Sequence, residues 1–249
     1  DSLVLKAMAI VLGKHLEPVI APTCVHVKGH GGAKKAVRDV FHALTLDSHV
    51  MKSDVKSYYA SIDHILLFDT LSAYITDKYV LRLLWQYLKR TVCYGENYRD
   101  VTKGISLGCP LSPLIAALFL KPLDDAMQGS GLFYARFMDD WIVIAPTRWK
   151  LRKTVKQVNA ILNRLLLKKH PDKTFIGKAE RGFDFLGYFF RPGLLRVAKK
   201  TVSNMKERIA RLYEQGVDTV SIGQYVLRWV RWANAGVVEF IYCHHRNRI

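Results

Sequence analysis

The stretch FYARFMDDWIVIAP, residues 133–146, sets two adjacent aspartates between two apolar runs. Aromatic and β-branched residues dominate both runs, which favours two strands with the aspartates at the tip of a buried hairpin. Two like charges at such a turn repel each other and lose solvation, which is tolerable if a divalent cation lies there. Magnesium suits this position because one or two carboxylates usually hold it. The stretch therefore predicts a metal site at Asp139 and Asp140.

A third carboxylate stands at the end of another predicted strand, SHVMKSD, residues 48–54. Counting in twos, Val50, Lys52 and Asp54 share one face of that strand. Antiparallel pairing with the hairpin would bring Asp54 beside the two other acids, although the sequence alone leaves this pairing open. Three carboxylates around two metal ions are suited to phosphoryl transfer, in which one ion activates a hydroxyl and the other holds the leaving phosphate.

A second acidic pair, Asp124–Asp125, offers an internal comparison. It follows an apolar helix expected over residues 113–123, and no apolar run frames it on the C-terminal side. We interpret this pair as a solvated helix end.

Composition narrows the partners of the chain. Half of its 249 residues are hydrophobic, which is enough for a substantial core, and 38 Lys and Arg against 21 Asp and Glu give a net charge of +17. This surplus favours a polyanionic partner, with nucleic acid preferred over membrane. No apolar run is long enough to span a bilayer, and the first residues do not resemble a signal peptide, so we expect a cytoplasmic protein. The start without methionine indicates a fragment of a longer chain.

The four cysteines show no metal-ligand spacing, and reduced thiols are expected: Cys24, Cys93, Cys109 and Cys243. Apolar periodicity predicts an α+β chain whose last part, after about residue 196, is helical. The expected helices cover residues 3–18, 65–90, 113–123 (with Ser112 as N-cap) and 147–169, followed by two that end at Gly216 and Gly236.

Five stretches, taken in order, resemble the palm motifs of reverse transcriptases, most closely those of bacterial group II intron and retron enzymes. They are DVKSYYASIDH from residue 54, GISLGCPLSPLIAALFL from 104, RFMDDWIVIAP from 136, HPDKTFIGK from 170 and FDFLGYFF from 183. VLRWVRWANAG, from residue 226, resembles the thumb of the same family. The resemblance implies a right-hand polymerase: partial fingers over residues 1–48, a ferredoxin-like antiparallel palm with packed helices over 49–196, and a small helical thumb over 197–249.

The resemblance also implies roles for individual residues. Asp54, Asp139 and Asp140, with the backbone carbonyl of Val55, would hold two Mg²⁺ ions, for which Mn²⁺ can substitute. Tyr59 matches the aromatic gate that crowds a ribose 2′-OH and so selects deoxynucleotides. The alternative is that Tyr58 and Tyr59 simply pack.

Further matches concern the nucleotide and the primer. Residues Gly108 to Pro113, including Ser112, match the loop and helix start that back the incoming base and the template. Lys173 matches a lysine near the triphosphate, and an exposed turn lysine is the alternative. The stretch Phe185, Leu186 and Gly187 matches the primer grip, where glycine allows close backbone approach.

Basic residues predict contacts with a nucleic-acid backbone, and a solvated basic helix face is the alternative. The candidates are Lys28, Lys34, Lys35 and Arg38 near the start, Lys150, Arg152, Lys153 and Lys156 in the helix after the hairpin, and Arg228 and Arg231 in the thumb.

The chain departs from the family at three points. Leu107 stands where relatives often have glutamine, Ala117 replaces an asparagine, and a basic fingers motif upstream of the first helix is missing. The implied activity is extension of a DNA or RNA primer with deoxynucleotides on an RNA template, with a cognate structured RNA as a further partner and no membrane. Two alternatives remain: a maturase-like RNA-binding protein with the same fold, and an RNA-directed RNA polymerase. Oligomeric state is not predicted.

Overall fold

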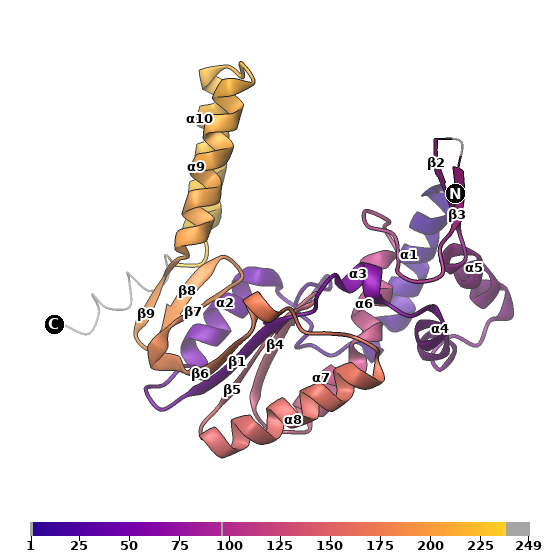
Figure 1. The fold of residues 1–249 in the computed structure, drawn as a ribbon, viewed down its shortest axis with the longest axis horizontal. Coiled ribbons are helices and arrows are strands. Elements are labelled where there is room, and N and C mark those ends of the chain that lie inside the picture. Colours follow the sequence, from indigo (N-terminus) through magenta and orange to yellow (C-terminus); the bar gives the residue numbers. More distant parts are fainter. Residues whose placement is uncertain (1, 96, 238–249) are drawn as a thin grey trace.

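The computed structural model describes residues 2–95 and 97–237. At its centre is a four-stranded antiparallel sheet with strand order β4-β5-β1-β6 (Figure 1). The sheet confirms the predicted antiparallel palm: β4 and β5 form the hairpin of the opening stretch, and β1 lies between β5 and β6. The bounds of the strands are β1 His49–Asp54, β4 Phe133–Phe137, β5 Asp140–Ala145 and β6 Phe175–Lys178.

The two faces of this sheet bury two separate apolar clusters. Met51 and Trp141 face the helical layer, which includes α6, α7 and α8, whereas Val50 and Ile142 face α2 and a second sheet. This division follows the two-residue period of the strands, so both faces are covered. The helices are α2 Gly32–Ala43, α6 Ser112–Phe119, α7 Lys121–Gln128 and α8 Arg148–Arg164, and the second sheet contains β7 Phe183–Phe185, β8 Tyr188–Arg191 and β9 Leu194–Val197.

Two groups of elements extend from opposite ends of the palm (Figure 1). The helices α9 and α10 project as a pair beyond the second sheet, where the sequence predicts a thumb. At the other end lie α1, α4, α5 and an exposed two-stranded hairpin. Their bounds are α1 Ser2–Leu16, α3 Tyr58–Ser61, α4 His64–Ser72, α5 Lys78–Leu88, β2 Thr91–Tyr94, β3 Asn97–Asp100, α9 Lys199–Glu214 and α10 Thr219–Asn234.

Three expected helices have wrong bounds. The helix expected over 113–123 is divided into α6 and α7. The helix expected over 65–90 is two helices, because the Asp77 carboxylate accepts from the N–H groups of Tyr79 and Val80 and caps a new start there. The helix expected over 147–169 begins after the Thr147 cap and ends at Arg164.

Ser112 is the first residue of α6 and not its N-cap. Its hydroxyl donates to the Ser106 carbonyl at 2.6 Å, so it stabilises the preceding loop. Cys24, Cys93 and Cys109 are free, as expected, and Cys243 lies outside the described residues. Within residues 2–95 and 97–237, no helix is both long and apolar enough to cross a bilayer.

Candidate active site

The register of the central sheet brings the three predicted carboxylates to one end of it. Asp54, the last residue of β1, is the direct partner of Asp140, the first residue of β5. Directly opposed residues of an antiparallel pair point to the same face, about 5 Å apart. Asp139 stands in the two-residue turn before Asp140. The structure thus shows the antiparallel pairing of this strand with the hairpin, which the sequence left open.

The turn has an unusual backbone conformation. Met138, its first residue, has φ of 56° and is not glycine. A positive φ at the first position of a two-residue hairpin loop, and not at the second, fits a type II′ turn, which ordinarily takes glycine there. A side chain in this conformation costs roughly 1–2 kcal/mol, so surrounding contacts must hold the turn in place.

Burial and mutual repulsion raise the pKa values of both turn carboxylates. Burial raises the pKa of Asp139, and the charge of Asp54 raises it further. Burial raises the pKa of Asp140 to about 7, against the opposing influence of Lys52. Oδ1 of Asp140 is buried and has no hydrogen-bond partner within residues 2–95 and 97–237. An additional cation would relieve these penalties, so the donor set fits a divalent metal ion.

Two lysines partly compensate the negative charge of Asp54 and Asp140. Lys173 Nζ donates to Asp54 Oδ2 at 2.8 Å, and Lys52 Nζ lies 3.6 Å from Asp140 Oδ1. Among the described residues, no three carboxylate, imidazole or thiol groups converge into a preformed metal cage. Asp54 and Asp140 thus each lie beside a lysine of the chain.

The backbone after Asp54 also bears on the predicted ligand set. Two hydrogen bonds join this segment to the β6 side: His170 N–H to the Asp54 carbonyl at 2.7 Å, and Lys56 N–H to the Lys168 carbonyl at 2.8 Å. In this pattern Val55 pairs with Lys169 without hydrogen bonds, so its own carbonyl points to the opposite edge. That edge is where the β4–β5 turn lies.

The two adjacent tyrosines occupy different environments. Tyr58 is buried, and its hydroxyl donates to the Ala116 carbonyl at 2.6 Å. Tyr59 is partly exposed, and burial together with the charge of Asp139 raises its pKa. The structure therefore places Tyr58 in the core and Tyr59 within electrostatic reach of Asp139.

The predicted primer grip borders the same hollow as Asp54 and Asp140. This hollow, about 530 Å³ in volume, is lined by Asp54, Asp140, Lys173 and residues 183–187, together with the start of α9. Gly187 has φ of 84°, and a Cβ there would lie 2.9 Å from the Trp232 ring of α10. The glycine thus allows the thumb helix to pack closely against the β7–β8 turn.

The predicted nucleotide loop is divided between two environments. Gly108 has φ of 80°, a backbone conformation suited to glycine. The Ser112 side chain is fully buried. Pro113 lines a different hollow of about 700 Å³ together with His26 and Lys28.

Not all of the predicted backbone-binding cations face solvent freely. Lys34 Nζ donates to the Tyr188 hydroxyl and to the Trp232 carbonyl, and it lies 3.8 Å from the Trp232 ring centre. These contacts join α2 to the thumb helix α10. Burial lowers the pKa of Lys34 to about 8. Lys35 pairs with Asp39 at 2.5 Å, and Arg38 is also on α2. Lys28, Arg228 and Arg231 are exposed.

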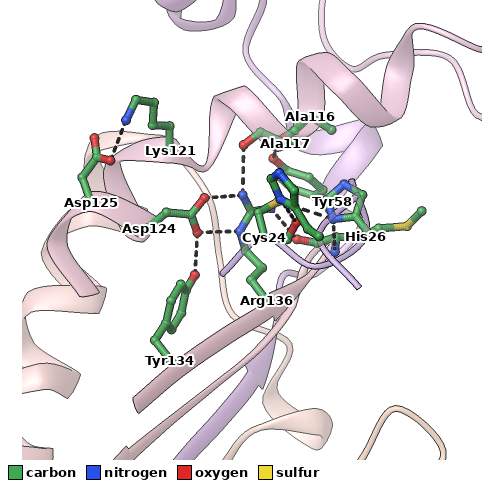
Figure 2. A network of polar contacts seen from close by, with 12 residues as sticks. Cys24, His26, Tyr58, Ala116, Ala117, Lys121, Asp124, Asp125, Tyr134 and Arg136 are labelled. Carbon is green, nitrogen blue, oxygen red and sulfur yellow. Dashed lines mark hydrogen bonds and ion pairs between the residues drawn. The ribbon is translucent and has the colours of Figure 1, made fainter. Parts of the chain in front are cut away.

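The interpretation of Asp124–Asp125 as a solvated helix end is wrong for Asp124. Its carboxylate is buried and accepts from Arg136 Nε at 2.7 Å, from Arg136 Nη2 at 2.5 Å and from the Tyr134 hydroxyl at 2.8 Å (Figure 2). Only Asp125 is exposed, where it pairs with Lys121 at 2.6 Å. The missed signal was Arg136 itself, an arginine at a core-facing position of an apolar strand, which requires a buried carboxylate.

Comparisons with known proteins agree with this geometry. The profile of the family described as reverse transcriptase (RNA-dependent DNA polymerase) matches residues 2–190. The group II intron-encoded protein LtrA of Lactococcus lactis subsp. cremoris is 23% identical over 165 residues, which cover 66% of this chain and 27% of LtrA. Protein YkfC of Escherichia coli (strain K12) is 23% identical over 174 residues, which cover 56% of this chain and 46% of YkfC. The chain thus spans less than half of either relative.

Solved structures show the same fold at low identity. Apo telomerase from Candida tropicalis superposes with a TM-score of 0.62 and 11% identity, over 80% of this chain and 41% of that one. Telomerase from Candida albicans, in complex with a fragment of telomeric RNA, superposes with a TM-score of 0.58 and 14% identity, over 96% of this chain and 49% of that one. These similarities show a right-hand polymerase fold.

Proposed function

Because the chain belongs to the reverse transcriptase (RNA-dependent DNA polymerase) family, we propose that it extends the 3′-OH of a primer with deoxynucleotides along an RNA template. The observation that carries this proposal is the register that sets Asp54 beside Asp140, next to the turn that bears Asp139. Three acids at one sheet end, two of them with raised pKa values, form a donor set suited to phosphoryl transfer.

Asp54, Asp139 and Asp140, with the Val55 carbonyl, would hold two Mg²⁺ ions. When bound, these ions would lower the pKa of the primer hydroxyl and neutralise charge on the triphosphate. The protein contributes mainly position. Asp54 is held by β5 and by the His170 N–H, and Asp140 is held by β1 and β4, so their carboxylates need little reorganisation.

Lys173 and Tyr59 would act on the incoming nucleotide. The Lys173 side chain is half exposed and its ammonium lies against Asp54, so it can reach a phosphate that enters the same hollow. Tyr59 lies near Asp139 and would crowd a ribose 2′-OH, which favours deoxynucleotides. The Phe185–Gly187 turn, which lines the hollow, would hold the primer end.

The partners proposed are an RNA template, a DNA or RNA primer, deoxynucleotides and a cognate structured RNA. The net charge of +17 supports polyanionic partners. Exposed Lys28, Arg228 and Arg231 would contact phosphates, whereas Lys34 already serves the contact between α2 and α10. Residues 1–48, 49–196 and 197–249 would act as partial fingers, palm and thumb, in the cytoplasm.

The test is Mg²⁺-dependent extension of a DNA primer on an RNA template by the full chain, beside Asp139→Ala. We expect extension by the wild type only, with deoxynucleotides preferred over ribonucleotides. Equal extension by both proteins would refute the site. A preference for ribonucleotides would instead support an RNA polymerase, and RNA binding without any extension would support the maturase-like alternative.

A further inference from the structure

We propose that Arg136, Asp124 and His26 are positioning residues for Asp139, because together they hold both peptide groups of Met138. This inference rests on the proposed function, since it concerns the turn that carries a proposed metal ligand. Arg136 is the first residue of the stretch RFMDDWIVIAP, but no role is assigned above to any of the three side chains.

The central contact is a two-sided hold on Met138. Its N–H donates to His26 Nδ1 at 2.9 Å, and its carbonyl accepts from Arg136 Nη1 at 2.8 Å. The hairpin ladder ends at the Phe137–Asp140 pair, so it does not use these two groups. Because Met138 has a positive φ and directly precedes Asp139, the orientation of its peptide groups sets the direction in which the Asp139 side chain leaves the turn.

Arg136 is itself fixed on its other side. Its side chain is fully buried, and the guanidinium binds Asp124 through both Nε and Nη2. Nη2 also donates to the Ala117 carbonyl at 3.0 Å, and the Tyr134 hydroxyl completes the contacts of Asp124 (Figure 2). A planar guanidinium bound at two edges cannot rotate, so its remaining nitrogen, Nη1, has one fixed direction. The corner between α6 and α7 thereby sets the position of the catalytic turn.

His26 is fixed in a similar way. Residues 23–25 run beside β4, joined to the backbone of Arg136 by two hydrogen bonds of 2.9 Å. The imidazole packs edge-on against Phe137, with ring centres 5.8 Å apart, and it also contacts the Pro113 carbonyl. Since Nδ1 accepts from the turn, the ring proton is assigned to Nε2, which can donate to that carbonyl. The imidazole thus connects the turn to the start of α6.

Stability alone does not explain this arrangement. Replacing a buried ion pair by apolar residues of similar volume is often neutral or stabilising. An apolar pair at positions 124 and 136 would still fill the core, but it could not donate a hydrogen bond to the Met138 carbonyl. We therefore predict that apolar residues at positions 124 and 136 preserve the fold but alter the geometry of the turn.

The first experiment uses the full chain with Arg136→Met, Asp124→Leu and Tyr134→Phe combined, so that none of these three polar side chains is left buried without its partner. Hydrogen exchange followed by mass spectrometry reports on the turn peptide, and steady-state kinetics on primer extension. We expect the variant to melt near the wild type while the turn exchanges faster. We also expect kcat to fall about 10²-fold, as misplacement by about 1 Å can cause, with the KM for template-primer unchanged.

The second experiment separates two roles of His26: accepting the hydrogen bond from Met138 N–H and packing its ring against Phe137. The Asn side chain carries its Oδ1 where His carries Nδ1, so His26→Asn can still accept from Met138 N–H, whereas His26→Ala cannot. We expect turn exchange and kcat close to wild type for His26→Asn, and both altered for His26→Ala. Equal values for the two variants would overturn the role of His26.

The outcomes also distinguish this inference from the proposed function. A folded triple variant with wild-type turn exchange and wild-type kcat would overturn the inference and leave the function intact. If the wild-type chain extends no primer, the exchange measurements still decide whether the network holds the turn. If the triple variant does not fold, the two His26 variants decide.

Discussion

The chain contains two pairs of adjacent aspartates, and the structure gives them opposite environments. In α7, Asp124 is buried against Arg136, and Asp125 is exposed beside Lys121. At the β4–β5 turn, Asp139 and Asp140 are both partly buried, and their nearest protein cations do not suppress their raised pKa values. A buried acid with a dedicated cation stabilises the fold, whereas a cluster of acids without one is suited to bind an added cation. The comparison teaches that flanking residues alone do not distinguish these cases.

The largest expected effect comes from neutralising one acid of each pair and measuring activity. Asp139→Asn should lower primer extension on the order of 10³-fold or more, because it removes a proposed metal ligand. Asp125→Asn, which neutralises an exposed acid with the same chemistry, should leave extension unchanged. Steady-state rates at saturating Mg²⁺ measure both. Comparable losses in the two variants would show that net charge, and not the site, governs activity.

The free energy of unfolding should be sensitive to neutralising Asp124, in the Asp124–Asp125 pair. Asp124→Asn leaves Arg136 charged, buried and without its carboxylate, which should lower the free energy of unfolding by about 3–5 kcal/mol. Asp139→Asn should not destabilise the chain, because it removes repulsion that already raises the pKa of Asp139. Urea denaturation of both variants measures the change in the free energy of unfolding that each substitution causes. A stable Asp124→Asn protein would contradict the assigned role of the buried pair.

His26 provides a pH-dependent test of the contacts near the buried pair. Burial, together with the charge of Arg136, lowers the pKa of His26 to about 4 from 6.5, while Cys24, His30 and Asp124 are the other titratable groups around it. The imidazole binds a proton more readily in the unfolded chain than in the folded chain. The contribution of neutral His26 to the free energy of unfolding is therefore complete above pH 6.5 and is lost as the pH falls towards 4. The total is up to about 3 kcal/mol.

The measurement is the free energy of unfolding between pH 7 and 4 for the wild type and His26→Asn. The variant lacks the titrating imidazole, so its stability should fall less over this range. Parallel curves would mean that His26 is not held neutral in the folded chain.

The smallest effect concerns Lys173, the half-exposed cation beside Asp54. Lys173→Met should change the free energy of unfolding by less than about 1 kcal/mol, as is usual for exposed pairs. Without nucleotide it should also strengthen Mn²⁺ binding a few-fold, because the ammonium no longer competes for Asp54. Calorimetric titration of Mn²⁺ measures this change. Weaker binding would show that Lys173 assists the metal rather than competing with it.

Much of the site geometry could be predicted from the sequence, because it depends on strand period and on a two-residue turn. From the sequence, Asp54 could be placed at the end of a strand, whereas the pairing of that strand with the hairpin stayed open until the register of β1 and β5 showed it. The roles of the acids, of Tyr59 and of the primer grip remain predictions.

The burial of Asp124 could not be predicted in the same way. Its partner lies twelve residues later in a strand, and their meeting depends on how α7 packs against the sheet. Likewise, the hydrogen bond from Lys34 to the Trp232 carbonyl depends on where α10 packs, and no local pattern in α2 predicts that position. Periodicity predicts which face of an element is apolar, but it does not predict which polar groups meet within the core.

The pairing of Asp54 with Asp140 also bears on how this chain can tolerate change. Since β1 is hydrogen-bonded on both sides, a shift by one residue would turn Asp54 to the other face of the sheet. The strand register therefore sets the spacing of Asp54 and Asp140, however long the chain of residues that joins them. Those residues include α4, α5 and the exposed β2–β3 hairpin, which emerge away from the sheet (Figure 1). Insertions or deletions at the tip of that hairpin should leave the carboxylates in place, so the chain can acquire new contacts there without rebuilding its chemistry.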